Sequence, residues 1–161
     1  MKKIIAIVII VNAAFLLWLY VIYPHSHRGN LDIFCESTLN MSNDRSGSVF
    51  TFGGTVITRF KSDSTGYIGL LGAAEYQGKT YNVSREVGFT YEPKDDDGIY
   101  AIKLGTISPM QADNIPNELV EYNITGRAGI INSYVLRHAN ENTWSIGNIY
   151  TPIVMCVDKL R

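Results

Sequence analysis

The sequence lacks the short motifs that mark the common enzyme classes. It contains no Gly-x-Ser-x-Gly elbow, no phosphate-binding Walker loop and no His-Glu-x-x-His pair. No other combination of nucleophile, base and metal ligand is recognisable in it. We therefore expect no catalytic residue, no cofactor and no enzymatic activity.

The sequence also lacks any cluster of basic residues. Lys2, Lys3 and Arg28 lie in or beside an N-terminal apolar run, whereas all 15 acidic residues follow that run. Proteins that bind nucleic acid usually present a basic surface to the phosphates. The negative charge of the region after residue 28 therefore argues against direct binding to nucleic acid.

Cysteine is scarce, with only Cys35 and Cys156. Their wide separation excludes a Cys-x-x-Cys redox motif, and two thiols without a companion His make a poor metal site, so we expect no bound metal. In an oxidising compartment an even pair favours a disulfide, which would close a loop of about 120 residues. The alternative is two buried free thiols.

The most informative feature that is present is a long apolar run over residues 4–23. About 20 helical residues span roughly the 30 Å hydrocarbon core of a bilayer. A secretory signal would be shorter and would end in a small-residue cleavage site. This run instead ends in Trp18, Tyr20 and Tyr23, aromatic residues typical of the membrane–water interface. We predict an uncleaved transmembrane helix over residues 4–23.

The charges beside this run predict its orientation. The positive-inside rule places residues 1–3, with Lys2 and Lys3, in the cytoplasm. Residues 24–30 then form a connector, and residues 31–161 form one domain on the other side of the membrane. The lipid bilayer is thus the first expected partner. Within the run, Asn12 either donates a hydrogen bond to another helix or is a polar residue that the bilayer tolerates.

Residues 31–161 show the turns and alternation of a β protein. The clearest strand covers residues 80–91, where apolar and polar positions alternate. One helical turn is expected at 117–122. Other strands are expected at 49–60, 67–76, 99–107, 129–138, 143–150 and 153–157. We predict a mainly β fold, in which a single N-terminal transmembrane helix precedes a small antiparallel β-barrel or sandwich.

Arg85 lies on the apolar face of the strand at residues 80–91, between Val83 and Val87. A charge in a core is costly unless it is paired. Three interpretations remain open: the guanidinium pairs with an internal carboxylate, extends to the rim, or contacts an anionic ligand inside a barrel.

Several features together resemble a known family. They are the basic start before one anchor, Cys35 soon after it, the Ser-Arg-Glu-Val-Gly-Phe-Thr-Tyr stretch at 84–91, and the Tyr-Thr-Pro-Ile-Val-Met-Cys segment at 150–156. The arrangement resembles the FidL-like family of small enterobacterial inner-membrane proteins and, more loosely, ToxS-type companions. The resemblance implies a single-pass protein of the bacterial inner membrane, with its C-terminal domain in the periplasm.

The resemblance also implies a role. Members are typically encoded beside a membrane-anchored, ToxR-like transcription regulator with a winged-helix domain. A ToxS-type companion binds the regulator's periplasmic domain and protects or activates it, and in related pairs the two proteins together form a β-barrel that can hold a bile salt. No catalytic residue can be carried over, and Cys35 and Cys156 transfer only as the disulfide.

Three functional hypotheses follow. The first is an accessory protein whose periplasmic domain binds and stabilises or activates a membrane-anchored regulator. The second is a β-barrel that senses a small apolar anion such as a bile salt, with Arg85 as the charged contact. The third is a periplasmic enzyme, against which the absence of catalytic motifs counts, or an assembly factor for the cell envelope or for fimbriae.

Overall fold

The computed structural model describes residues 10–18, 31–45 and 47–159. The chain divides into two compact units, Met1–Asn30 and Leu31–Arg161, and each is described by itself. In the first unit, residues 10–18 are helical. None of the helices within the described residues has the length and apolar character needed to cross a membrane. The predicted span 4–23 extends past residues 10–18 on both sides, and Tyr20 and Tyr23 lie outside the described residues.

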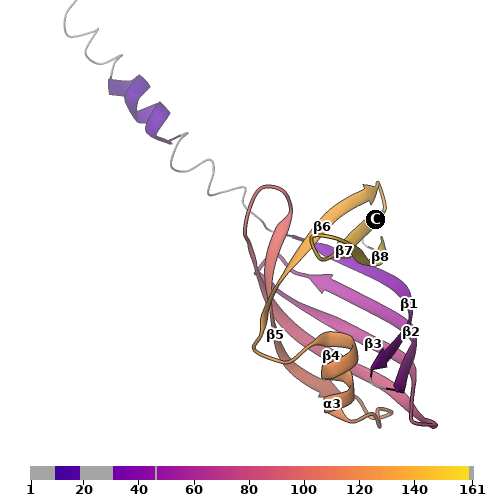
Figure 1. Cartoon of the computed structure of the whole chain (residues 1–161). Coiled ribbons are helices and arrows are strands. Elements are labelled where there is room, and N and C mark those ends of the chain that lie inside the picture. The colour runs from indigo at the N-terminus through magenta and orange to yellow at the C-terminus, as the bar shows by residue number, and fades with distance from the viewer. Residues whose placement is uncertain (1–9, 19–30, 46, 160–161) are drawn as a thin grey trace, which may run out of the picture. The chain divides into compact units, whose positions relative to one another are not determined.

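The second unit is a closed barrel of eight antiparallel strands that follow one another in chain order (Figure 1). This confirms the predicted mainly β fold and selects the barrel over the sandwich. The strands are β1 (Ile33–Arg45), β2 (Ser48–Phe60), β3 (Thr65–Tyr76), β4 (Lys79–Pro93), β5 (Ile99–Pro109), β6 (Ile131–Asn140), β7 (Thr143–Gly147) and β8 (Pro152–Asp158).

The strand prediction needs two corrections. β1 was not predicted as a strand, although its residues pair with β2 over the whole length from Ile33 to Arg45. β7 ends at Gly147 instead of residue 150, because the Asn148 side chain accepts hydrogen bonds from the backbone N–H groups of Tyr150 and Thr151 and forms a turn. The remaining predicted strands are present with slightly different ends.

Strand β4 shows why the alternating pattern predicted the fold well. Its buried residues are the odd-numbered ones from Tyr81 to Tyr91, while the even-numbered ones are more exposed. The reversal into β5 is made by Asp95, whose side chain accepts hydrogen bonds from the N–H groups of Asp97 and Ile99. Short-range polar contacts of this kind make a tight turn between two strands.

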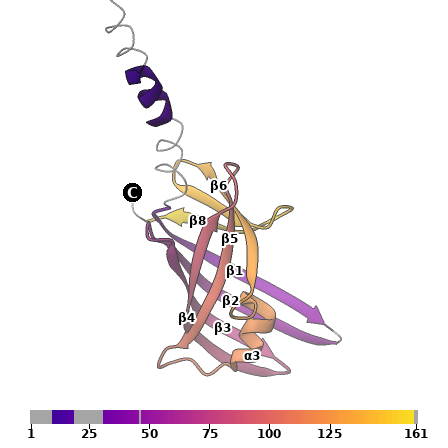
Figure 2. The ribbon, with the colours of Figure 1, turned by 90° about the vertical axis from the view of Figure 1, so that its left-hand side faces the viewer.

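The segment between β5 and β6 lies at one end of the barrel (Figures 1 and 2). It contains α3 (Asn117–Val120) and η1 (Glu121–Thr125), which confirms the helical turn expected at 117–122. Val120 is fully buried against a core cluster that includes Phe50 and Leu70. The segment therefore closes this end of the barrel with apolar contacts.

Candidate functional site

The barrel is closed by a very short seam between its first and last strands. β1 and β8 pair only through Cys35 with Asp158 and through Glu36 with Val157. One further backbone hydrogen bond, from Lys159 N to Phe34 O, is 2.7 Å long. Beyond this point β1 pairs with β2 alone, and β1 and β2 extend well past β7 and β8 (Figures 1 and 2).

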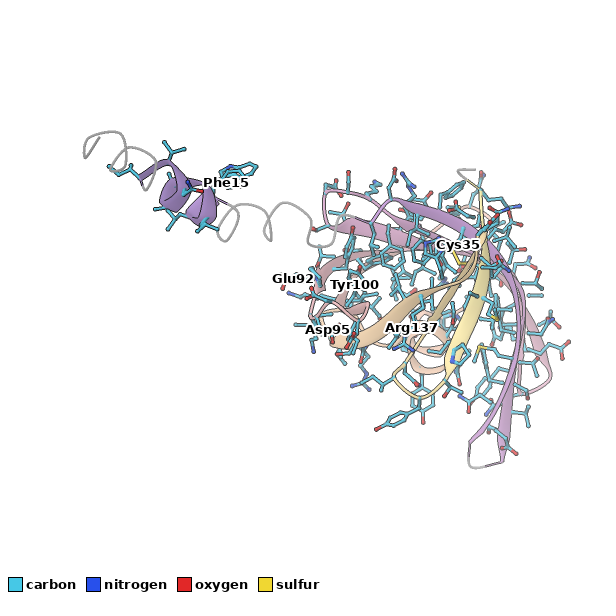
Figure 3. All side chains as sticks on the ribbon, turned by 90° about the horizontal axis from the view of Figure 1, so that it is seen from above. Phe15, Cys35, Glu92, Asp95, Tyr100 and Arg137 are labelled. Carbon is cyan, nitrogen blue, oxygen red and sulfur yellow. A yellow bond between two sulfur atoms is a disulfide. The ribbon has the colours of Figure 1, made fainter. Side chains whose placement is uncertain are left out.

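A disulfide reinforces the seam. Cys35 and Cys156 are bonded across it, with their Cα atoms 5.3 Å apart and both residues fully buried (Figure 3). This confirms the predicted disulfide and removes the free-thiol alternative. On the outer surface, Lys159 and Glu36 form an exposed ion pair with an N–O distance of 3.4 Å. Such exposed pairs contribute little, so the disulfide is the stronger tie.

On the C-terminal side of Cys35, β1 presents an accessible strand edge. The bond from Lys159 N to Phe34 O shows that Phe34 directs its backbone groups toward β8. In an antiparallel strand this direction repeats at every second residue. Thr38, Asn40 and Ser42 therefore direct their N–H and C=O groups to the same side, where none of them bonds to another described strand.

An apolar cavity of about 130 Å³ lies inside the barrel. Its lining includes residues of the core cluster that contains Leu70 and of a second core cluster that contains Phe89. It also includes residues from both sides of the seam, namely Leu39 from β1 and Ile153 and Val154 from β8. Further lining residues come from the barrel wall and the end segment: Val56, Phe60, Ile68, Leu70, Phe89, Ile102, Leu104, Ile124 and Ile146. The seam and the cavity thus belong to one site.

The residues with polar side chains that line the cavity are Thr58, Thr125 and Tyr134, each of which carries a hydroxyl. The Thr125 hydroxyl donates to the backbone oxygen of Gly126 at 3.1 Å. Burial raises the pKa of Tyr134, so its hydroxyl is neutral at physiological pH. The lining includes no charged side chain, so this cavity is suited to apolar groups.

Arg85 points into the core, where it pairs with Asp113, and both side chains are almost completely buried. Arg85 Nε donates to Asp113 Oδ2 at 2.8 Å, and Nη2 contacts Asp113 Oδ1. The remaining contacts are from Nη1 to Asn117 Oδ1 at 3.0 Å and from Nη2 to the oxygen of Ile115 at 2.7 Å. The structure therefore shows the first of the three interpretations, pairing with an internal carboxylate.

Arg85 is not one of the residues that line the cavity. Its partners hold the segment after β5 against β4, because Asp113 Oδ2 also accepts a hydrogen bond from Ser84 N at 2.9 Å. Sequence reasoning missed Asp113, which lies 28 residues from Arg85 in a segment without periodicity. The unmatched charge of Arg85 was the only signal that such a carboxylate exists.

The remaining predicted site residues lie in the first unit. Asn12 and Trp18 belong to the helix at residues 10–18, and both are exposed there. Trp18 stacks on Phe15 with ring centroids 6.1 Å apart. Within the described residues, no group of His, Cys, Asp and Glu could hold a metal ion.

Comparison with known protein families identifies a matching family. The family model described as "FidL-like putative membrane protein" matches residues 72–156, from the middle of β3 to Cys156. No curated protein and no solved structure matches the chain. Since the matched region covers more than half of the 161 residues, the chain belongs to the FidL-like family.

Proposed function

We propose that this protein is a single-pass inner-membrane accessory protein whose barrel binds the periplasmic domain of a membrane-anchored, ToxR-like transcription regulator. The observation that carries the proposal is the seam, where two residue pairs, one further backbone hydrogen bond and one disulfide close the barrel. Binding would stabilise or activate the regulator without any catalytic step. Membership of the FidL-like family supports a membrane-associated role.

The edge of β1 supports a specific mode of binding. An exposed edge offers backbone donors and acceptors that an extended segment of a partner can pair with. Thr38, Asn40 and Ser42 present such groups over about 14 Å, at roughly 3.4 Å per residue. Every second side chain of an added strand would then face the interior of the barrel, close to Leu39 and Met41, which pack on the core.

The predicted topology supports the proposal in a second way. Anchoring both partners in one membrane raises their effective concentration, so modest affinity between the two periplasmic domains suffices. A phosphatase fused after Arg161 should be active outside the cytoplasm, and an inactive fusion would overturn this orientation.

The decisive experiment is co-purification in mild detergent from cells that express a co-encoded regulator, followed by mass spectrometry. Ser42→Pro removes an outward-facing N–H without removing a hydrogen bond of the β1–β2 ladder, whereas Ser42→Ala keeps that N–H. We expect the regulator to co-purify with wild type and Ser42→Ala and to be lost with Ser42→Pro. Recovery with all three would refute pairing along β1, and recovery with none would refute the accessory role.

The apolar cavity favours sensing of a small apolar ligand as a second candidate function. Its volume of about 130 Å³ is well below the roughly 300–1,000 Å³ of typical ligand pockets. A bile-salt-like anion would also need a cation, and Arg85 is engaged by Asp113. We therefore place this function second, and no observation favours envelope or fimbrial assembly.

A further inference from the structure

We propose that the cavity inside the barrel binds a small phenol-type molecule, a neutral aromatic ring with one hydroxyl group, and that the hydroxyl of Thr58 is its polar contact. The inference rests on ligand sensing, the second candidate function above, and narrows it to one chemical class. It does not depend on binding to a regulator.

The side-chain hydroxyl of Thr58 is the first observation that points to a ligand. Thr58 lies on β2 opposite Cys35 and Ile68, and it shares the inward direction of these neighbours because it lines the cavity. The residue is only 7% exposed. Among the described residues, none forms a hydrogen bond with this hydroxyl. Buried polar groups nearly always have a partner, so this one suits a ligand that supplies the missing hydrogen bond.

Other inward-facing hydroxyls of the barrel are bonded within the protein. Those of Ser37, Tyr91 and Thr125 donate to backbone oxygens at 3.3, 2.6 and 3.1 Å. Thr58 differs from them, and so does Tyr134, whose hydroxyl has no hydrogen-bond partner in the part of the chain that the structure describes. The cavity therefore offers polar groups that its own wall leaves unused, with Thr58 the more deeply buried of the two.

The size and lining of the cavity indicate the rest of the ligand. A dry apolar cavity of about 150 Å³ holds a benzene molecule, and this cavity has a similar volume of about 130 Å³. Phe60 and Phe89 line it with ring centroids 5.0 Å apart, and aromatic rings favour such neighbours. None of the described lining residues is charged, and an unpaired charge is costly to bury. A single neutral aromatic ring fits these conditions.

The cavity has an entrance beside the seam. Leu39 of β1 and Val154 of β8 line it from the two sides of the gap that begins where the pairing of these strands ends at Glu36 and Val157. Ile153 also lines the cavity and is 53% exposed, which places the entrance next to the start of β8. A small molecule can therefore enter without breaking the strand ladder.

The test follows isoleucine methyl groups by NMR in the full-length protein, reconstituted in nanodiscs and titrated with phenol. Ile68 and Ile102 line the cavity, whereas Ile57 and Ile131 do not. We expect saturable shifts of the Ile68 and Ile102 methyl signals and unchanged signals from Ile57 and Ile131. Toluene, which has a methyl group in place of the hydroxyl, should bind at the same methyl groups. Benzoate, which carries a charge, should not.

Thr58→Val tests the polar contact, because valine keeps the shape of threonine and removes the hydroxyl. The variant should weaken phenol binding by about threefold to tenfold, the usual worth of one hydrogen bond, without weakening toluene binding. The matched control is Thr55→Val on the same strand, at a residue that does not line the cavity. It should change the binding of neither compound.

The same titrations can contradict the inference at each step. Absence of saturable shifts at Ile68 and Ile102, or equal shifts at all four isoleucines, would overturn the binding site. Benzoate binding at these methyl groups would overturn the neutral class of ligand. Equal weakening of phenol and toluene by Thr58→Val would overturn the hydrogen bond. Because co-purification of the regulator is measured separately, failure of this inference is distinguishable from failure of the accessory role.

Discussion

Cys35 of β1 and Cys156 of β8 are bonded across the barrel seam, although 121 positions separate them in the chain. A cross-link over so long a loop stabilises a fold mainly by restricting the unfolded chain, by up to about 4–5 kcal/mol. Since the seam has only two paired positions, we expect Cys35→Ser to lower the free energy of unfolding by several kcal/mol. Thermal unfolding and protease resistance of the full-length protein in detergent measure this loss.

The control for this prediction is Cys35→Ser/Cys156→Ser, which should resemble the single variant because both lack the same bond. Wild-type protein treated with a strong reductant should approach them. If the single variant kept wild-type protease resistance, the disulfide would have no structural role.

The Arg85–Asp113 pair leads to the second prediction. Arg85→Met leaves the Asp113 carboxylate buried without its counter-charge, which typically costs about 3–5 kcal/mol. Arg85→Met/Asp113→Leu removes both charges and should recover much of the loss. Chemical denaturation of the three proteins tests this, and equal losses in the single and the double variant would show that the pair matters for packing instead of charge.

The third prediction concerns Tyr91, whose hydroxyl donates to the oxygen of Lys61 at 2.6 Å and accepts from Leu31 N at 3.2 Å. Burial raises the pKa of Tyr91 above its ordinary value of 10.0. An unfolded tyrosine therefore ionises before the folded one, so stability is full below pH 10 and falls as the pH rises through the folded pKa. Burial raises the pKa of Tyr100 and Tyr134 in the same way.

Unfolding of wild type and Tyr91→Phe at pH 8 and pH 11 separates the contribution of Tyr91. At pH 8 the variant should be less stable by about 1–3 kcal/mol, because buried groups lose their hydrogen-bond partner. At pH 11 the difference should shrink. A difference that is constant with pH would mean that Tyr91 does not titrate in this range.

The fourth prediction concerns the glycine pair Gly54 and Gly72, which lie opposite each other in β2 and β3. A Cβ atom on Gly54 would overlap the backbone oxygen of Leu71 and come within 2.8 Å of the Gly72 Cα. Gly54→Ala should therefore destabilise the barrel by about 1–3 kcal/mol, since backbone cannot give way as a side chain can. Thermal unfolding measures the change.

Gly69→Ala is the matched control on the same strand pair. Its Cβ would lie 3.5 Å from the Cβ of Ile57, an ordinary contact, so the variant should fold with nearly unchanged stability. Equal destabilisation by the two substitutions would point to a general effect of losing glycine and not to the close approach of β2 and β3.

The alternation of polar and apolar residues predicted most strands of the barrel, because strands such as β4 bury one face and expose the other. β1 escaped prediction because its inward positions include Ser37 and Asn43, so the polar and apolar residues do not alternate in sequence. Its conformation depends on the ladder with β2, which local sequence does not contain. Tertiary context overrides β-propensity in such strands.

The seam and the cavity were less predictable than the strands of the barrel. Sequence alone paired Cys35 with Cys156, since two cysteines allow one intramolecular pairing. The cavity, the short seam and the Asp113 partner of Arg85 depend on how strands distant in sequence are arranged. Met155 and Val157 of β8 were visible in the sequence as apolar residues, but only the buried position of Cys156 between them shows that they face outward.

The short seam has a consequence for the order in which the domain forms. β1 to β5 can assemble one hairpin at a time, because each strand pairs with its sequence neighbour. The seam requires residues 157 and 158 of β8, which are synthesised after all of β1 to β7. Contacts of such long sequence separation form late, so a nascent chain presents the whole edge of β1 before the barrel closes. The interval before closure is therefore a time when a partner or a folding catalyst has access to β1 that the finished barrel restricts.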